Sequence, residues 1–196
     1  HPDWDYSLVP QRDRVHAFVT ALGLTRFHLA GHSMGGHLSI LYALEYPEQL
    51  ASLALINNAG IVSPVASEFM RNVNAGNNNL IIRTRDDFDS MMAMVFEERP
   101  FAPWPMRKGL AARAIANADF NEVIFTSLRR DFEESLESRL PDIPCPVLIV
   151  WGDNDRILDV SAVSVMQQAL PSADVVIMEN MGHMPILERP QETAEY

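Results

Sequence analysis

The sequence has 196 residues and the composition of a globular protein, so it can form one ordinary domain with a sizeable core. Its formal net charge of −11 argues against binding to nucleic acid, because phosphate recognition needs clustered lysine and arginine. No apolar run reaches the roughly 18 residues that span a bilayer, no charged-then-apolar leader opens the chain, and the one cysteine, Cys145, is expected to be a buried structural thiol.

The first predicted element is an amphipathic helix near the start of the chain. Apolar residues recur there at i, i+3, i+4 and i+7, namely Val15, Phe18, Val19 and Leu22. Gly23 stands where the C-cap of that helix belongs. A short apolar strand over 26–30 follows it.

The next segment, GHSMGG at residues 31–36, lies between that strand and an amphipathic helix closed by Pro47. It has the Gly-x-Ser-x-Gly form of a nucleophile elbow, a sharp strand-to-helix turn that exposes a serine hydroxyl, here that of Ser33. We expect Gly31 and Gly35 to let the strand and the helix approach without a Cβ clash. The start of the helix would place unpaired N–H groups beside a developing oxyanion.

Three further apolar runs, at 50–56, 145–151 and 175–178, are typical of parallel strands covered on both faces. A helix over 162–169 separates the last two, and Pro190 indicates a final helix start. Helices that alternate with buried strands predict an α/β fold with a parallel sheet.

The middle of the chain, from about 61 to 140, shows no strand pattern. Helices are predicted there over 86–96, 106–118 and 122–136, with loops at 77–79 and 100–105. A helical block between two sheet strands is an insertion, and over an active site it would be a cap. The expected organisation is therefore a core segment over 1–60, a helical cap over 61–140 and a second core segment over 141–196.

A serine nucleophile needs a basic partner within hydrogen-bond reach. Among six histidines, His183 is the best candidate, because it follows the last apolar strand, in a loop at the edge where open α/β sheets place their sites. Of the others, His28 is expected to pack in a strand and His37 in a helix, and His16 lies on the exposed side of its helix. His32 should point away from the serine hydroxyl, and His1 is terminal.

The base in turn needs a carboxylate to fix its tautomer. The segment after the strand at 145–151 offers Asp153 and Asp155, and Asp155 is preferred because a carboxylate further beyond the strand can reach back toward His183. Spacing alone does not choose between them, and Asp159 is a third candidate. Asn57 and Asn58, after the strand at 50–56, cannot serve as carboxylates, and Glu188 is expected to be structural.

The order of serine, aspartate and histidine along the chain is that of the α/β-hydrolases. The segments GHSMGG, VWGDNDRILD and NMGHMPILERP resemble the elbow, acid and histidine motifs of that family, and the chain is most similar to its monoacylglycerol-lipase-type branch. The resemblance implies the C-terminal part of an α/β-hydrolase fold and assigns the acid to Asp155.

The resemblance also implies a mechanism. Ser33 would attack an ester carbonyl, His183 would transfer the proton, Asp155 would orient His183, and the backbone N–H of Met34 would be one oxyanion donor. The second donor and the preceding strands of the family have no counterpart here, and the chain begins with a histidine, so an N-terminally truncated chain is expected. The cytoplasm is the default location, although a leader would have been lost with the upstream part.

Aromatic side chains in the helical block suggest where an acyl chain could bind. Phe96, Phe101 and Trp104 are candidates for substrate contacts, with the alternative that such residues form the core of the cap. The expected activity is hydrolysis of small-molecule esters or lipids, without a cofactor or metal. Alternatives are a carbon–carbon bond hydrolase of the meta-cleavage type and a hydrolase-like protein that binds its ligand without turnover.

Overall fold

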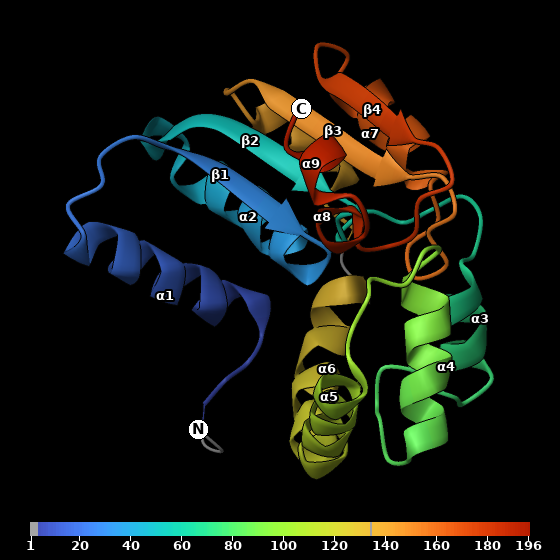
Figure 1. Cartoon of the computed structure of the whole chain (residues 1–196). Helices are drawn as coiled ribbons and strands as arrows, with labels where there is room; N and C mark the ends of the chain where they lie inside the picture. Colours follow the sequence, from blue (N-terminus) through green and yellow to red (C-terminus); the bar gives the residue numbers. More distant parts are fainter. Residues whose placement is uncertain (1–3, 134) are drawn as a thin grey trace.

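The computed structural model describes residues 4–133 and 135–196 and contains one parallel sheet (Figure 1). Its four strands are β1 (Phe27–His32), β2 (Leu50–Ile56), β3 (Val147–Gly152) and β4 (Asp174–Met178), in the spatial order β1-β2-β3-β4. All three strand pairs are parallel. The α/β class with a parallel sheet is therefore confirmed.

Helices flank the sheet. They are α1 (Leu8–Ala21), α2 (Met34–Glu45), α7 (Ala162–Ala169), α8 (Pro185–Glu188) and α9 (Pro190–Thr193), with 3-10 turns at Pro47–Gln49 and Glu137–Asp142. Helix α2 packs against β1 and β2, and α1 packs on α2. The main core lies between these layers and includes the fully buried side chains of Tyr42, Ile149 and Trp151.

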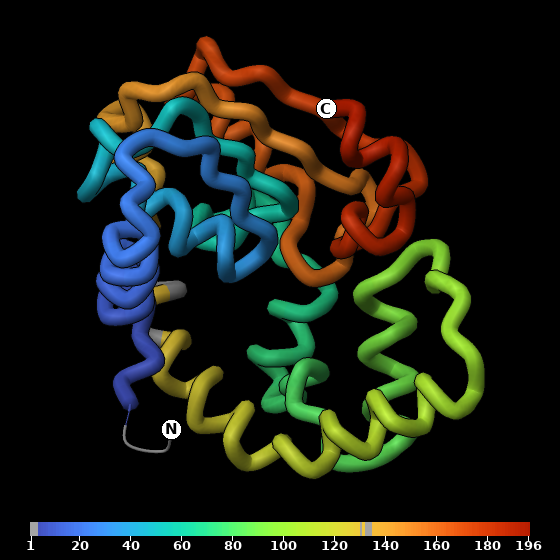
Figure 2. The backbone as a smooth tube through the Cα atoms, turned by 60° about the vertical axis from the view of Figure 1, so that its left-hand side comes forward, coloured from blue at the N-terminus to red at the C-terminus, as the bar shows by residue number. Residues whose placement is uncertain are grey.

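Four helices separate β2 from β3 in the chain: α3 (Glu68–Asn74), α4 (Arg85–Val95), α5 (Trp104–Ala116) and α6 (Ala118–Glu133). Figure 2 shows them as an arc of chain beside the sheet, on the side toward which the strands point in Figure 1. Helix α3 was not predicted, although Ser67 caps it by accepting a hydrogen bond from the Met70 N–H. Helix α5 begins at Trp104, inside a predicted loop, because proline is tolerated in the first turn of a helix.

The prediction that the apolar face of α1 is buried is wrong in part. Val19 is buried, but Phe18 and Leu22 are 63% and 57% exposed. Helix α1 lies on α2 rather than on the sheet, so only a narrow strip of its surface is covered. His16 is half-buried rather than exposed, because its ring stacks on that of Tyr46 at 3.8 Å between ring centroids.

Two expectations from the sequence concern the single cysteine and a membrane-spanning segment. Cys145 is half-buried before β3, and burial raises its pKa, which keeps the thiol in its unreactive neutral form. Within residues 4–133 and 135–196, no helix has the length and apolarity needed to cross a bilayer.

Close packing of α2 against β1 and against the segment after β2 depends on two glycines of the GHSMGG segment. A Cβ on Gly31 would lie 2.4 Å from the carbonyl oxygen of Gly35, and a Cβ on Gly36 would lie 2.3 Å from the Cβ of Asn58. A Cβ on Gly35 itself would meet nothing within 4 Å. The second glycine required for the close approach is therefore Gly36, and not Gly35 as the motif had suggested.

Substitution of the two outer glycines of the pentapeptide should accordingly have different effects. Gly31→Ala should lower the free energy of unfolding by about 1–3 kcal/mol or more, because the clash is with backbone that cannot rotate away. Gly35→Ala should be neutral or should raise the free energy of unfolding by up to about 1 kcal/mol, since its Cβ would occupy open space in a helix, where alanine is favoured over glycine. Urea unfolding midpoints of the two variants measure the difference, and equal midpoints would contradict this account.

A second prediction concerns His37, which is buried on α2. Burial lowers its pKa from the ordinary 6.5 to about 4. The unfolded chain therefore takes up a proton near pH 6.5 while the folded chain does not, so stability should fall as the pH drops from 6.5 toward 4, by up to about 3 kcal/mol. Above pH 6.5 His37 is neutral in both states, so its contribution to the free energy of unfolding should no longer change with pH.

The variant His37→Gln removes that titration. Its free energy of unfolding, measured by urea at several pH values, should change less steeply between pH 6.5 and 4 than that of the parent chain. Thr20→Gln, which introduces the same amide at an exposed position of α1 and changes no titratable group, provides the control and should keep the parent slope. A parent slope in His37→Gln would show that other groups dominate this pH range.

Candidate active site

Ser33 occupies the turn between β1 and α2 in a conformation that L-residues rarely adopt. Its φ is 53° and its ψ is −123°. Hydrogen bonds hold the turn: the Ser33 N–H donates to the carbonyl oxygen of Ile56 at 3.1 Å, and the Ser33 carbonyl oxygen accepts from the N–H groups of Gly36 and Ala59, each at 2.9 Å. Such strain persists only where surrounding bonds enforce it, and it is common at functional sites.

The structure brings the three predicted catalytic residues together. His183 Nε2 lies 2.9 Å from Ser33 Oγ, and His183 Nδ1 lies 2.8 Å from Asp155 Oδ2. His183 is 5% exposed, and the Asp155 side chain is fully buried. Because a carboxylate only accepts, Nδ1 carries the imidazole proton and Nε2 is left to accept the serine proton.

The Asp155 carboxylate accepts four hydrogen bonds. Oδ1 accepts from the backbone N–H groups of Ile157 and Leu158, at 2.8 and 3.0 Å. Oδ2 accepts from His183 and also from Nδ2 of Asn57, at 2.7 Å. Both oxygens are thus satisfied in a place where an unpaired carboxylate would be very costly.

Asn57 is a residue that sequence reasoning missed. The sequence showed only that it could not be the acid, whereas in the structure its side chain donates a hydrogen bond to Asp155. It is fully buried directly after β2, has a φ of 41°, and its Nδ2 also lies 3.5 Å from the Gly182 carbonyl oxygen. Its position at the carboxyl end of a strand next to that of Asp155 was the signal that could have found it.

The loop that carries His183 is held from the serine side by His32. The Nε2–H of His32 donates to the His183 carbonyl oxygen at 2.7 Å, and the two rings lie 4.8 Å apart between centroids. His32 thus contacts His183 directly, a contact that sequence reasoning did not predict. Burial lowers the pKa of His32, and the nearby His183 lowers it further.

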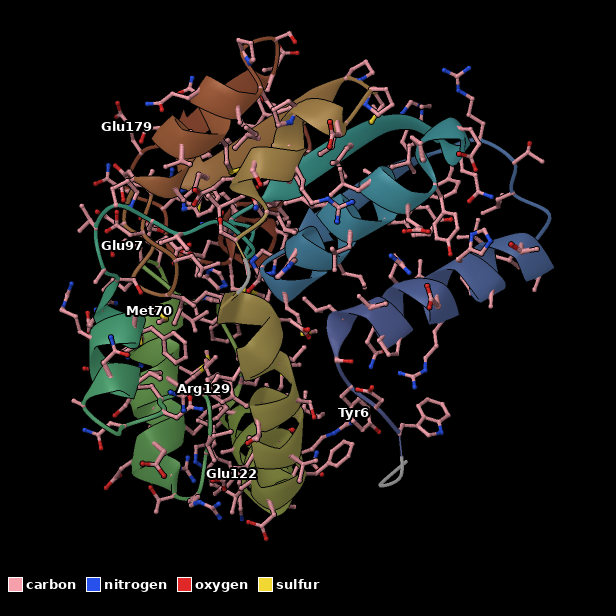
Figure 3. The ribbon with its side chains drawn as sticks, turned by 180° about the vertical axis from the view of Figure 1, so that it is seen from behind. Tyr6, Met70, Glu97, Glu122, Arg129 and Glu179 are labelled. Atoms are coloured by element: carbon pink, nitrogen blue, oxygen red, sulfur yellow. The ribbon has the colours of Figure 1, made fainter. Side chains whose placement is uncertain are left out.

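The same loop is bound to the helical block. The His183 N–H donates to the Val95 carbonyl oxygen at the end of α4, at 2.8 Å. The Glu188 carboxylate accepts from the backbone N–H groups of Gly182, Glu97 and Glu98, at 3.1, 3.0 and 2.9 Å. Figure 3 shows Glu97 near the junction of the helical block and the sheet. Glu188, expected to be structural, connects the histidine loop to that junction.

The predicted oxyanion donor lies beside the serine. Met34 is the first residue of α2, and the first N–H groups of a helix have no intrahelical partner.

In residues 4–133 and 135–196, no group of three or more His, Cys, Asp or Glu side chains is arranged to hold a metal ion.

A cleft of about 620 Å³ opens next to the acid. Asp155 and Phe96 line it, together with the charged side chains of Asp153, Arg156 and Asp159. Phe96 is also buried in the core of the helical block beside Phe69 and Ile157, which fits the alternative that the aromatic residues form that core. The structure does not bring Phe101 or Trp104 to this cleft, since they are 92% and 63% exposed.

The geometry defines a class of protein: the chain belongs to the α/β-hydrolase family. All 196 residues match the family described as "Alpha/beta hydrolase family". Sequence and topology agree, since a serine elbow, an acid after β3 and a histidine after β4 occur in the order of that family.

Within this family the chain resembles lipases. It is 33% identical to Lipase 1 of Psychrobacter immobilis and 34% identical to Monoacylglycerol lipase abhd6-B of Xenopus laevis, in each case over 97% of this chain. A crystal structure described as a membrane phospholipase A, a novel bacterial virulence factor, is 45% identical with a TM-score of 0.96 over 100% of this chain. The chain spans 61%, 59% and 63% of the lengths of these three proteins.

Asn57→Asp tests the contact between Asn57 and Asp155. It replaces a donor by a second carboxylate at the same place, and we expect the free energy of unfolding to fall by about 2 kcal/mol or more near pH 7. The repulsion raises the pKa of the pair, so the loss should shrink as the pH falls toward about 5 and one oxygen becomes protonated.

Urea unfolding across this pH range measures the effect. Asn154→Asp is the matched control, because it adds the same charge to the acid loop at an exposed position. The account fails if Asn57→Asp is no less stable than Asn154→Asp at pH 7, or if the gap between them widens in acid.

Proposed function

We propose that this chain carries the catalytic site of a serine hydrolase that cleaves carboxylic esters of lipids or other acyl groups. The observation that supports it is a continuous series of hydrogen-bond contacts, in which His183 Nε2 lies 2.9 Å from Ser33 Oγ and His183 Nδ1 lies 2.8 Å from Asp155 Oδ2. A strained serine whose hydroxyl contacts a tautomer-fixed imidazole is suited to nucleophilic attack.

In the proposed reaction, Ser33 Oγ attacks the ester carbonyl while His183 Nε2 takes the hydroxyl proton. The Met34 N–H stabilises the oxyanion that forms. His183 then gives the proton to the leaving alcohol, and an acyl-enzyme remains on Ser33. Water attacks that acyl group with His183 as the base, which releases the acid and restores the serine. Asp155, held by Asn57, stabilises the imidazolium in both half-reactions.

We further propose that residues 61–140 act as a cap over core segments 1–60 and 141–196. The bonds from the His183 loop to Val95, Glu97 and Glu98 support this, because they bring the end of α4 against the base. Phe96 lies between these contacts and lines the cleft beside Asp155, so it is the candidate for contact with the substrate. The lipase names of the relatives favour an ester bond over a carbon–carbon bond.

Labelling with a fluorophosphonate probe tests the nucleophile. The parent chain should be labelled and Ser33→Ala should not, because the probe reacts only with an activated serine. Ser164→Ala, which changes an exposed serine on α7, should be labelled like the parent. His183→Gln should slow labelling by about a thousandfold or more, since the base is lost.

Labelling that persists in Ser33→Ala would refute the assignment.

Turnover identifies the kind of bond that is cleaved: the chain should hydrolyse p-nitrophenyl esters faster than a vinylogous diketone. The reverse preference would indicate a carbon–carbon bond hydrolase.

A further inference from the structure

The helical block contains a cationic segment in a strongly acidic chain. Between residues 99 and 118 there are four basic side chains, Arg99, Arg107, Lys108 and Arg113, and no aspartate or glutamate. The whole chain has a formal net charge of −11. This segment, which comprises α5 and the loop before it, therefore has a charge opposite to that of the rest of the molecule.

Acidic residues border this segment on both sides, with Glu97 and Glu98 before it and Asp119 and Glu122 after it, and Glu98 pairs with Arg189 at 4.0 Å. Arg83 pairs with Asp119 at 2.8 Å and with Glu122, both at the start of α6. Asp89 pairs with Arg107 at 3.2 Å. Arg99, Lys108 and Arg113 form no ion pair with any residue that the structure describes, so three of the four cations remain available to an anionic partner.

The same segment exposes large apolar side chains. Phe101 is 92% exposed and Trp104 is 63% exposed, while Met106 and Leu110 are 56% and 49% exposed. Two of these are the aromatic residues that sequence reasoning had assigned to substrate contacts. Neither aromatic side chain lines the cleft beside Asp155.

Cationic and apolar side chains lie next to one another on this segment. Lys108 lies over the Trp104 ring at 5.2 Å from its centroid. Met106 and Leu110 are four residues apart and Arg113 follows three residues later, so these three share another side of α5. Figure 2 shows α5 along the outer edge of the helical block, away from the sheet. The segment therefore projects apolar and cationic groups together from a convex edge.

We infer that α5 and the loop before it, residues 99–116, form a docking surface for a lipid bilayer with anionic headgroups. Tryptophan and phenylalanine insert at the boundary between headgroups and acyl chains, and each nearby lysine or arginine adds about 1 kcal/mol of attraction to anionic lipid. Apolar side chains on more than one side of a protruding helix suit a fluid layer better than a partner of fixed shape. This surface does not rest on the proposed catalytic function, because binding needs no turnover.

Binding to vesicles tests the inference. The parent chain should float with phosphatidylcholine vesicles that contain phosphatidylglycerol and should bind pure phosphatidylcholine much more weakly. Added salt should weaken the binding, because the attraction is screened over a Debye length of about 8 Å at 0.15 M ionic strength. Equal binding to both kinds of vesicle, or no binding to either, would overturn the inference.

Two double variants separate the charge from the apolar contribution. Lys108→Glu with Arg113→Glu, and Phe101→Ala with Trp104→Ala, should each lower the partition into anionic vesicles about tenfold or more. The matched control is Phe18→Ala with Leu22→Ala, two apolar side chains at the end of α1 that are 63% and 57% exposed, which should bind like the parent. An equal loss in the control would show that the binding is general adhesion of exposed apolar groups.

Insertion can be followed without large changes to the surface. Brominated lipids should quench part of the tryptophan fluorescence of the parent chain, and this part should disappear in Trp104→Phe, which keeps an aromatic ring in place. Unfolding midpoints equal to that of the parent would show that the variants are folded. Quenching that persists in Trp104→Phe would place the contact elsewhere on the molecule.

Discussion

The buried carboxylate of Asp155 is the interaction on which the candidate site depends. An ionised carboxylate can be removed from water only if its oxygens keep hydrogen-bond donors. Here the donors come from the turn that follows β3, from Asn57 after β2 and from His183 after β4. One buried charge therefore fixes the relative positions of three segments that end neighbouring strands, and the imidazole that faces Ser33 is oriented as a result.

The histidine loop is shared between the sheet and the helical block. It receives a hydrogen bond from His32 on the serine side and gives one to Val95 at the end of α4. Glu188 adds a carboxylate that accepts from this loop and from the two residues after Phe96. The position of His183 is thus set jointly by the strand ends and by residues that the chain supplies between β2 and β3.

The parts of the structure that the sequence predicted are those in which local chemistry is decisive. Continuous apolar runs gave the strands, and the Gly-x-Ser-x-Gly pattern located Ser33, because a strained turn needs small neighbours. The surroundings of Asn57 could not be predicted, since its partner lies 98 residues further along the chain. Phe18 and Leu22 had the right spacing for a buried face, but spacing does not reveal that α1 packs mainly on α2.

The contact between the two histidines has an electrostatic consequence. In the proposed reaction His183 becomes a cation each time it takes the serine proton. A second cation on His32, with its ring centroid 4.8 Å away, would oppose that step by about 3 kcal/mol at an effective dielectric constant of about 20. Burial lowers the pKa of His32 and so keeps it neutral while its Nε2–H remains bound to the His183 carbonyl. The histidine of the elbow therefore behaves as a fixed dipole, and the positive charge can form on one imidazole alone.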